Sequence, residues 1–139
     1  MRLHIVARGK IGGGPEAELV TRYARRIAWP FRITELAGRR QAPPPAPRGV
    51  TVMLDEKGEV LSSAGLARRL AAWRDEGVAE ARFLIGGAEG FDAREREAAD
   101  LLLAFGRATW PHLLVRAMLA EQLWRTTSIL ANHPYHREA

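Results

Sequence analysis

The stretch ARFLIGGAEGF, residues 81–91, decides the fold of this sequence. Its first half is short and apolar, which is typical of a buried strand. The glycines of IGGAEG, residues 85–90, end that strand and predict a turn whose backbone is not covered by side chains. Phe91 and Asp92 then begin a charged segment that predicts a helix. We therefore interpret residues 81–91 as a strand, a glycine-rich turn and a helix start in succession.

Further strand-like segments lie on both sides of this unit. Polar and apolar residues alternate over residues 2–7 and 31–36, and residues 50–55 form an apolar run that ends in an acid, so all three predict strands. Residues 101–105 fit either a fifth strand or a continuation of the preceding helix, because periodicity does not separate the two. Residues 56–63, EKGEVLSS, are expected to form a polar crossover.

Three more helices are expected where apolar residues recur at three- and four-residue spacing. The first begins at Pro15, the second is capped by Ser62 or Ser63, and the last follows Pro111. Strands that alternate with helices predict an α/β fold with a mostly parallel sheet flanked by helices.

The length of 139 residues fits a single domain over residues 1–139. The proline-rich segment at residues 38–49 is expected to be an extended connection inside that domain, since the roughly 37 residues before it are too few for a separate core. The chain has no cysteine, no apolar run near the roughly 20 residues of a membrane span, and no pattern of a secretory signal. A cytoplasmic protein without membrane contact is expected.

The charge of the chain favours an anionic partner. Lys and Arg total 21 against 16 Asp and Glu, a net charge of +5, and Lys10 and Lys57 are the only lysines. Arginine offers a planar fork for phosphates and stacks on bases, so this balance favours a nucleic acid. A coding bias toward arginine would give the same composition, and charge alone leaves both interpretations open.

The segment at residues 111–131 is apolar on most sides of the predicted helix. Such a helix is buried on more than one side. One side is expected to face the sheet and the other a second subunit, so the sequence predicts a homodimer with this helix in the interface. Leu119 and Leu123 are predicted to lie in that interface.

Three loops are expected at the carboxyl ends of the strands, where open parallel sheets bind ligands. They follow Leu54-Asp55, comprise residues 85–90, and comprise residues 105–112. The glycine loop is neither GxGxxG nor a P-loop, so a dinucleotide or nucleoside triphosphate site is not supported, and a purely structural turn is the alternative. Pro111 and His112 close the third loop.

The chain ends on NHPYHREA, residues 132–139, a dense run of hydrogen-bonding and titratable groups. His133 and His136 have the spacing H-x-x-H, but no cysteine or carboxylate pair joins them, so no metal site is expected. His112, at the start of the last helix, and Arg116, one turn later, are further candidates, although a solvated cap residue would have the same place as His112.

Three segments, VMLDEKGEVLSS, FLIGGAEGF and PHLLVRAMLAEQLWRTTSILANHPYHRE, together with the opening RLHIVARGK, resemble the RlmH family of SPOUT RNA methyltransferases. The resemblance covers nearly the whole chain. It implies a SPOUT-type α/β domain with a C-terminal trefoil knot, a homodimer, and S-adenosylmethionine as methyl donor without a metal. The implied reaction is methylation of N3 of a pseudouridine in 23S rRNA within the assembled ribosome.

The resemblance also implies site residues. The cofactor would be held mainly by backbone groups of three loops, and the substrate side would include a tail delivered from the other subunit. The implied cofactor residues are Leu54, Gly86, Gly87, Phe105, Gly106, Arg107, Ala108, Thr109 and Trp110, and the implied catalytic residues are His112, Arg116, Tyr135, His136 and Arg137.

Two features differ from the family pattern. The region at residues 38–49 is shorter and lacks a lysine-rich helical segment, and FGRATW, residues 105–110, replaces a loop rich in serine and leucine. A catalytically silent protein that binds RNA or the ribosome, and a SPOUT enzyme that acts on another RNA, are therefore the alternative functions.

Overall fold

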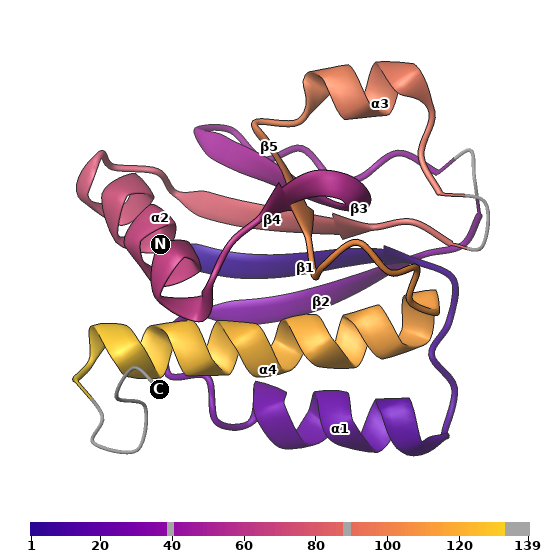
Figure 1. The fold of residues 1–139 in the computed structure, drawn as a ribbon, viewed down its shortest axis with the longest axis horizontal. Coiled ribbons are helices and arrows are strands. Elements are labelled where there is room, and N and C mark those ends of the chain that lie inside the picture. The colour runs from indigo at the N-terminus through magenta and orange to yellow at the C-terminus, as the bar shows by residue number, and fades with distance from the viewer. Residues whose placement is uncertain (39–40, 88–89, 133–139) are drawn as a thin grey trace.

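One sheet of five parallel strands organises the chain. A computed structural model describes residues 1–38, 41–87 and 90–132, and the strands occur in the order β2-β1-β4-β3-β5 (Figure 1). The predicted α/β fold with a mostly parallel sheet flanked by helices is confirmed. The strands are β1 (Arg2–Arg8), β2 (Phe31–Leu36), β3 (Gly49–Val60), β4 (Glu80–Ile85) and β5 (Leu101–Ala104).

Local signals in the sequence start three of the helices. Ser62 accepts a hydrogen bond from the backbone N–H of Gly65 at 3.0 Å, and Asp92 and Glu95 form a capping box. Pro15 is the first residue of its helix, where its missing N–H costs nothing. The helices are α1 (Pro15–Ala24), α2 (Ser63–Asp75), α3 (Ala93–Ala98) and α4 (His112–Leu130).

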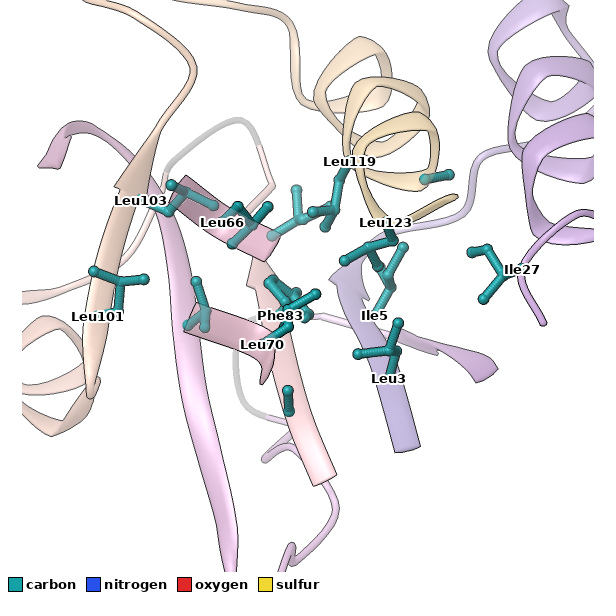
Figure 2. Close-up of a cluster of buried hydrophobic side chains, with 14 of the residues drawn as sticks. Leu3, Ile5, Ile27, Leu66, Leu70, Phe83, Leu101, Leu103, Leu119 and Leu123 are labelled. Carbon is teal, nitrogen blue, oxygen red and sulfur yellow. The ribbon is translucent and has the colours of Figure 1, made fainter. Parts of the chain in front are cut away.

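The main core lies between the sheet and the helices α1, α2 and α4 (Figure 1). Leu3 and Ile5 from β1, Phe83 from β4, and Leu119 from α4 meet there with no exposed surface (Figure 2). Burial of each such side chain contributes about 1.5–3 kcal/mol to folding. The other face of the sheet carries α3 and a smaller cluster around Met53.

The strand β3 is longer than predicted. It continues to Val60, into the stretch at residues 56–63 that the sequence predicts to be a polar crossover, and both Leu54 and Glu59 pair with Leu103 of β5. Residues 55–58 therefore bulge out of the ladder, and we call them the β3 bulge. The prediction was wrong because most side chains at residues 55–60 are exposed and charged, which leaves no apolar pattern to read.

Gly58 lets the β3 bulge lie against β5. A Cβ added to Gly58 would stand 2.6 Å from the backbone carbonyl of Leu102 and 2.7 Å from the backbone nitrogen of Leu103. Real Cβ atoms do not approach other atoms so closely. The bulge is therefore fixed on β5 by a contact that only glycine permits.

The helix α4 is largely buried within its own chain. It packs against α1, α2 and β4, and none of its residues is in the exposed class. Leu119 and Leu123 are 0% exposed and belong to the main core, so their predicted place in a dimer interface is wrong. Three neighbours within one chain therefore account for much of the apolar circumference of α4.

A polar cluster is buried where the strands begin. His4 is 0% exposed; its Nδ1 donates to the carboxylate of Glu80 at 3.3 Å, and its Nε2 accepts from Thr34 at 2.7 Å and from Arg32 at 3.3 Å. Burial, reinforced by the charges of Arg32 and Arg82, lowers the pKa of His4 in spite of Glu80. The imidazole is thus neutral and packs as part of the sheet.

Candidate functional site

A cavity of about 660 Å³ opens at the carboxyl ends of β3, β4 and β5. It is bounded by the three loops that the sequence singles out, together with α3 and the start of α4. This is the edge at which parallel sheets bind ligands. Its walls are Leu54, Asp55, Glu56, Ile85, Gly86, Gly87, Gly90, Phe91, Arg96, Leu103, Ala104, Phe105, Gly106, Ala108, Thr109, Trp110, Pro111, His112 and Val115.

Gly86, Gly87 and Gly90 of the glycine loop contribute backbone without side chains to the cavity wall. A Cβ at Gly86 would lie 3.1 Å from the backbone of Gly90, so a larger residue would push the loop open. Gly90 has φ +71° and donates its N–H to the carbonyl of Gly87 at 3.0 Å. The loop therefore closes on itself and offers bare backbone to a ligand.

The segment of residues 105–110 also lines the cavity. We call it the cofactor loop after its predicted role. Five of its six residues line the cavity, and Arg107 is the exception. The Arg107 guanidinium turns back to the β3 bulge and donates to the carbonyls of Glu56, at 3.0 Å, and of Gly58. Trp110 donates its Nε1–H to the carbonyl of Phe105 at 3.0 Å and remains 42% exposed at the rim.

Charged groups stand beside an otherwise apolar surface. The side chain of Asp55 is 6% exposed, and its Oδ2 lies 2.8 Å from Nε of Arg96 on α3. Oδ1 of Asp55 accepts the backbone N–H of Lys57 at 2.9 Å. Glu56 contributes a second carboxylate, which accepts from the hydroxyl of Thr109.

His112 lies at the first turn of α4, within the cavity wall. Its Nδ1 is buried, and no other group of the described residues makes a hydrogen bond to it. Because His112 lines the cavity, its ring is placed to contact a ligand bound there.

Arg116 is not part of this cavity, although the sequence places it at the substrate side. It is 1% exposed, and its guanidinium contacts the carboxylate of Glu35 at 2.5 Å and the carbonyl of Gly9 at 3.2 Å. Burial disfavours the ionised Glu35, but bonds from the N–H of Ile11 and from Arg116 outweigh it, and the pKa of Glu35 is lowered. Arg116 therefore joins α4 to β2 and to the loop after β1.

Comparison with known proteins identifies the family to which this sheet and its loops belong. The family described as Predicted SPOUT methyltransferase matches residues 1–136. The chain belongs to the SPOUT methyltransferase family. It is 68% identical to a protein of Rhizorhabdus wittichii and 62% identical to one of Novosphingobium aromaticivorans, each match covering 99% of both chains. Both relatives are named Ribosomal RNA large subunit methyltransferase H.

A solved structure supports the fold of this SPOUT chain. The structure of a probable methylase family protein from Haemophilus influenzae superposes with a TM-score of 0.59. The match covers 99% of this chain and 70% of that one, at 7% sequence identity. At that identity the likeness concerns the fold alone.

The predicted residues of the SPOUT site now divide into three groups. Eight of the nine cofactor candidates and His112 line one cavity, whereas Arg107 and Arg116 form contacts within the protein. Tyr135, His136 and Arg137 lie outside the described residues. Among the residues that are described, no group of three or more His, Asp or Glu side chains is placed to hold a metal, and no helix is long and apolar enough to cross a membrane.

Some cavity residues carried no signal in the sequence. Phe91, Arg96 and Val115 reach the cavity because α3 and α4 pack over the strand ends. The capping box of α3 could be found from the D-x-x-E pattern at Asp92, but the direction in which the helix points depends on tertiary packing.

A second hollow, of about 590 Å³, lies along α1. Its walls include Arg22, Arg25 and Arg26, and they contain no large apolar side chain and no part of the glycine loop. Small-molecule sites are mostly apolar with a few convergent polar groups, so the cavity at the strand ends fits a cofactor better.

Proposed function

We propose that this SPOUT chain uses S-adenosylmethionine to methylate N3 of a pseudouridine in 23S rRNA of the assembled ribosome. One observation carries the proposal: a glycine loop and the cofactor loop enclose one cavity in a chain 56–68% identical to proteins named for methylation of large-subunit ribosomal RNA. The ribosomal substrate implies that the protein acts in the cytoplasm.

The cavity fits S-adenosylmethionine in size, shape and charge. Its volume of about 660 Å³ suits a drug-sized ligand, and the bare glycine loop leaves room for a ligand to approach the backbone. Leu54, Ile85 and Phe105 offer apolar surface for an aromatic base. Glu56 places a carboxylate beside the space for a cationic ligand, whereas the carboxylate of Asp55 is paired with Arg96. When bound, S-adenosylmethionine supplies an electrophilic methyl group on a positively charged sulfur.

His112 has the properties needed on the substrate side. The N3–H of pseudouridine must lose a proton as its nitrogen attacks, and a neutral imidazole accepts protons in the right pH range. The Nδ1 atom of His112 is buried beside the cavity and has no bond from the described residues. We assign His112 the role of binding the imide edge and accepting its proton, directly or through water.

The proposed role of the tail requires a second subunit. His112 and Leu130 stand at opposite ends of α4, which is roughly 27 Å long at 1.5 Å per residue (Figure 1). Arg137 follows Asn132 by five residues, which span at most about 18 Å. We therefore propose that Tyr135, His136 and Arg137, which follow the end of α4 away from His112, complete the cavity of a partner.

The outer side of α4 offers a surface for that partner. Leu114, Met118 and Ile129 recur on one side of the helix, are half-buried, and belong to neither of the described core clusters. A two-fold axis across this side would pair the helices in antiparallel fashion. The tail end of one subunit would then lie beside the His112 end of the other.

The proposal is tested by two measurements on the whole protein. Calorimetry should show binding of S-adenosylmethionine, and mass mapping should show one new methyl group on pseudouridine when ribosomes from a deletion strain are the substrate. RNA binding without cofactor binding would indicate a catalytically silent RNA-binding protein. A methyl group on a different RNA would support the proposed methyl transfer but would show that the proposed substrate is wrong.

A further inference from the structure

We propose that Arg107 is a positioning residue that holds the cofactor loop in the shape needed for binding. The proposal rests on the function proposed above, because it concerns the same cavity. It differs from the role implied by family resemblance, in which Arg107 belongs to the residues that touch the cofactor. The geometry instead places the Arg107 side chain against the β3 bulge, where it supports the residues that line the cavity.

The contacts of Arg107 point away from the ligand. Its neighbours Gly106 and Ala108 line the cavity, and Arg107 does not. One guanidinium nitrogen donates to the carbonyl of Glu56 at 3.0 Å, and the other donates to the carbonyl of Gly58. The φ of +96° at Gly106 belongs to the turn that immediately precedes Arg107.

The β3 bulge is a rigid anchor for this side chain. β3 pairs with β5 on both sides of the bulge, and Gly58 lies against the backbone of Leu102 and Leu103. Asp55 is held at the base of the bulge by Arg96. Residues 56 and 58 therefore present their carbonyls from a fixed position.

The cofactor loop, the β3 bulge and β5 are therefore each connected to the other two. The cofactor loop follows directly from β5, and Arg107 joins it to the bulge that β5 itself holds. The hydroxyl of Thr109 adds a second bond, to the carboxylate of Glu56. Without Arg107 the loop keeps its covalent link to β5 but loses its charged contact with the bulge.

Arginine suits this position better than lysine. A guanidinium donates to two carbonyls at once from a rigid planar fork, whereas an ammonium is a single point of charge on a flexible stem. A lysine at residue 107 can bond to one of the two carbonyls and should hold the loop partly. If only the positive charge at residue 107 mattered, Arg107→Lys would behave like the wild type. An effect of Arg107→Lys between those of the wild type and Arg107→Met would show that the bonds to both carbonyls matter.

Loss of the two hydrogen bonds from Arg107 to the β3 bulge should weaken cofactor binding. If the free loop samples several conformations and only one of them binds the cofactor, the apparent Kd equals the intrinsic Kd divided by the population of that conformation. A smaller population therefore gives weaker binding. We expect Arg107→Met to raise the Kd and KM for S-adenosylmethionine about tenfold, with Arg107→Lys between it and the wild type. The kcat at saturating cofactor should change less than twofold, since the side chain does not reach the reacting atoms.

Arg69→Met is the matched control. Arg69 pairs with Glu59 at 3.1 Å, on the same strand just beyond the bulge, and both side chains are well exposed. Its substitution removes the same charge and side chain from the neighbouring contact without touching the cofactor loop. The Kd and KM for S-adenosylmethionine should stay at the wild-type value.

The experiment combines calorimetry, steady-state kinetics and hydrogen exchange on the full chain without ligand. Amides of residues 105–110 should exchange faster in Arg107→Met than in the wild type or in Arg69→Met. Unchanged exchange in Arg107→Met would overturn the proposal, as would equal loss of affinity in both variants. If Arg107→Met does not fold, an Arg107→Lys variant with wild-type exchange and affinity would also overturn it. Failure of the wild type to bind S-adenosylmethionine would instead overturn the proposed function, while the exchange comparison would still decide whether Arg107 orders the loop.

Discussion

The guanidinium of Arg116 contacts the carboxylate of Glu35 at 2.5 Å, although 81 residues separate the two in sequence. Arg116 is 1% exposed on α4, whereas the Glu35 side chain on β2 is 36% exposed. Glu35 also accepts the backbone N–H of Ile11 at 2.9 Å. This pair connects the last helix to the sheet and to the loop after β1, so Arg116 serves the fold.

The two members of this pair should not be equally costly to remove. Glu35→Gln leaves the buried cation of Arg116 without its counter-charge, which we expect to lower the free energy of unfolding by about 3 kcal/mol. Arg116→Met leaves a carboxylate that water can reach, and a loss of about 1 kcal/mol is expected. Urea titration of both variants measures the order. A larger loss for Arg116→Met would contradict this account.

The stability of the protein should fall when the pH drops from 6.5 toward 5. His4 has a lowered pKa in the folded state, mainly because it is buried. Below the ordinary pKa of about 6.5 the unfolded chain takes up a proton that the folded chain does not, so acid favours unfolding. The contribution of His4 is complete above pH 6.5. Urea titrations at several pH values should show this slope, and His4→Gln should flatten it. An equally steep slope in His4→Gln would place its origin elsewhere.

Gly58 should not tolerate a side chain. A methyl group there would stand 2.6 Å from the backbone of Leu102, so the β3 bulge must move away from β5. We expect Gly58→Ala to lower the free energy of unfolding by about 1–3 kcal/mol. Gly13→Ala is the control, because a Cβ at Gly13 meets no atom within 4 Å. Thermal unfolding of the two variants tests the difference, and similar melting temperatures would show that the bulge is free to shift.

The sequence predicts the sheet well because its strands and caps depend on local patterns. Alternation and apolar runs predict β1, β2 and β4. Ser62, one of the two serines predicted as a cap, caps α2, and α3 starts after Asp92, close to the predicted helix start. It does not distinguish strand from helix at residues 101–105, because four residues cannot show a period. Pairing with β3 decides in favour of a strand.

The site is only partly predictable for a related reason. Loops that follow strands can be placed from sequence, and eight of nine cofactor candidates do meet in one cavity. The direction of a single side chain depends on tertiary contacts instead. Arg107 and Arg116 have the chemistry to bind phosphate, yet carbonyls of the β3 bulge and Glu35 bind them within the protein.

Two adjacent residues of α4 should separate association from folding. Met118 is half-buried outside the core clusters, whereas Leu119 is 0% exposed within the main core. Met118→Glu should give a folded monomer if this side of α4 forms the proposed dimer, because the charge would lose water in the interface. Leu119→Glu should unfold the chain. Sedimentation and circular dichroism distinguish the two results, and a Met118→Glu protein that remains dimeric would place the interface elsewhere.

Mixing two inactive variants should restore activity if the tail acts across subunits. One variant lacks residues 134–139, and the other carries His112→Ala. A mixed dimer then has one site with an intact His112 and an intact tail, on different chains. Equal mixing with free exchange makes half of the dimers mixed, so about a quarter of the wild-type activity is expected. Each variant alone should bind S-adenosylmethionine and remain inactive toward ribosomes. No recovery, with mixed dimers shown by mass spectrometry, would mean that the tail serves its own chain and would overturn the proposed action of the tail across subunits.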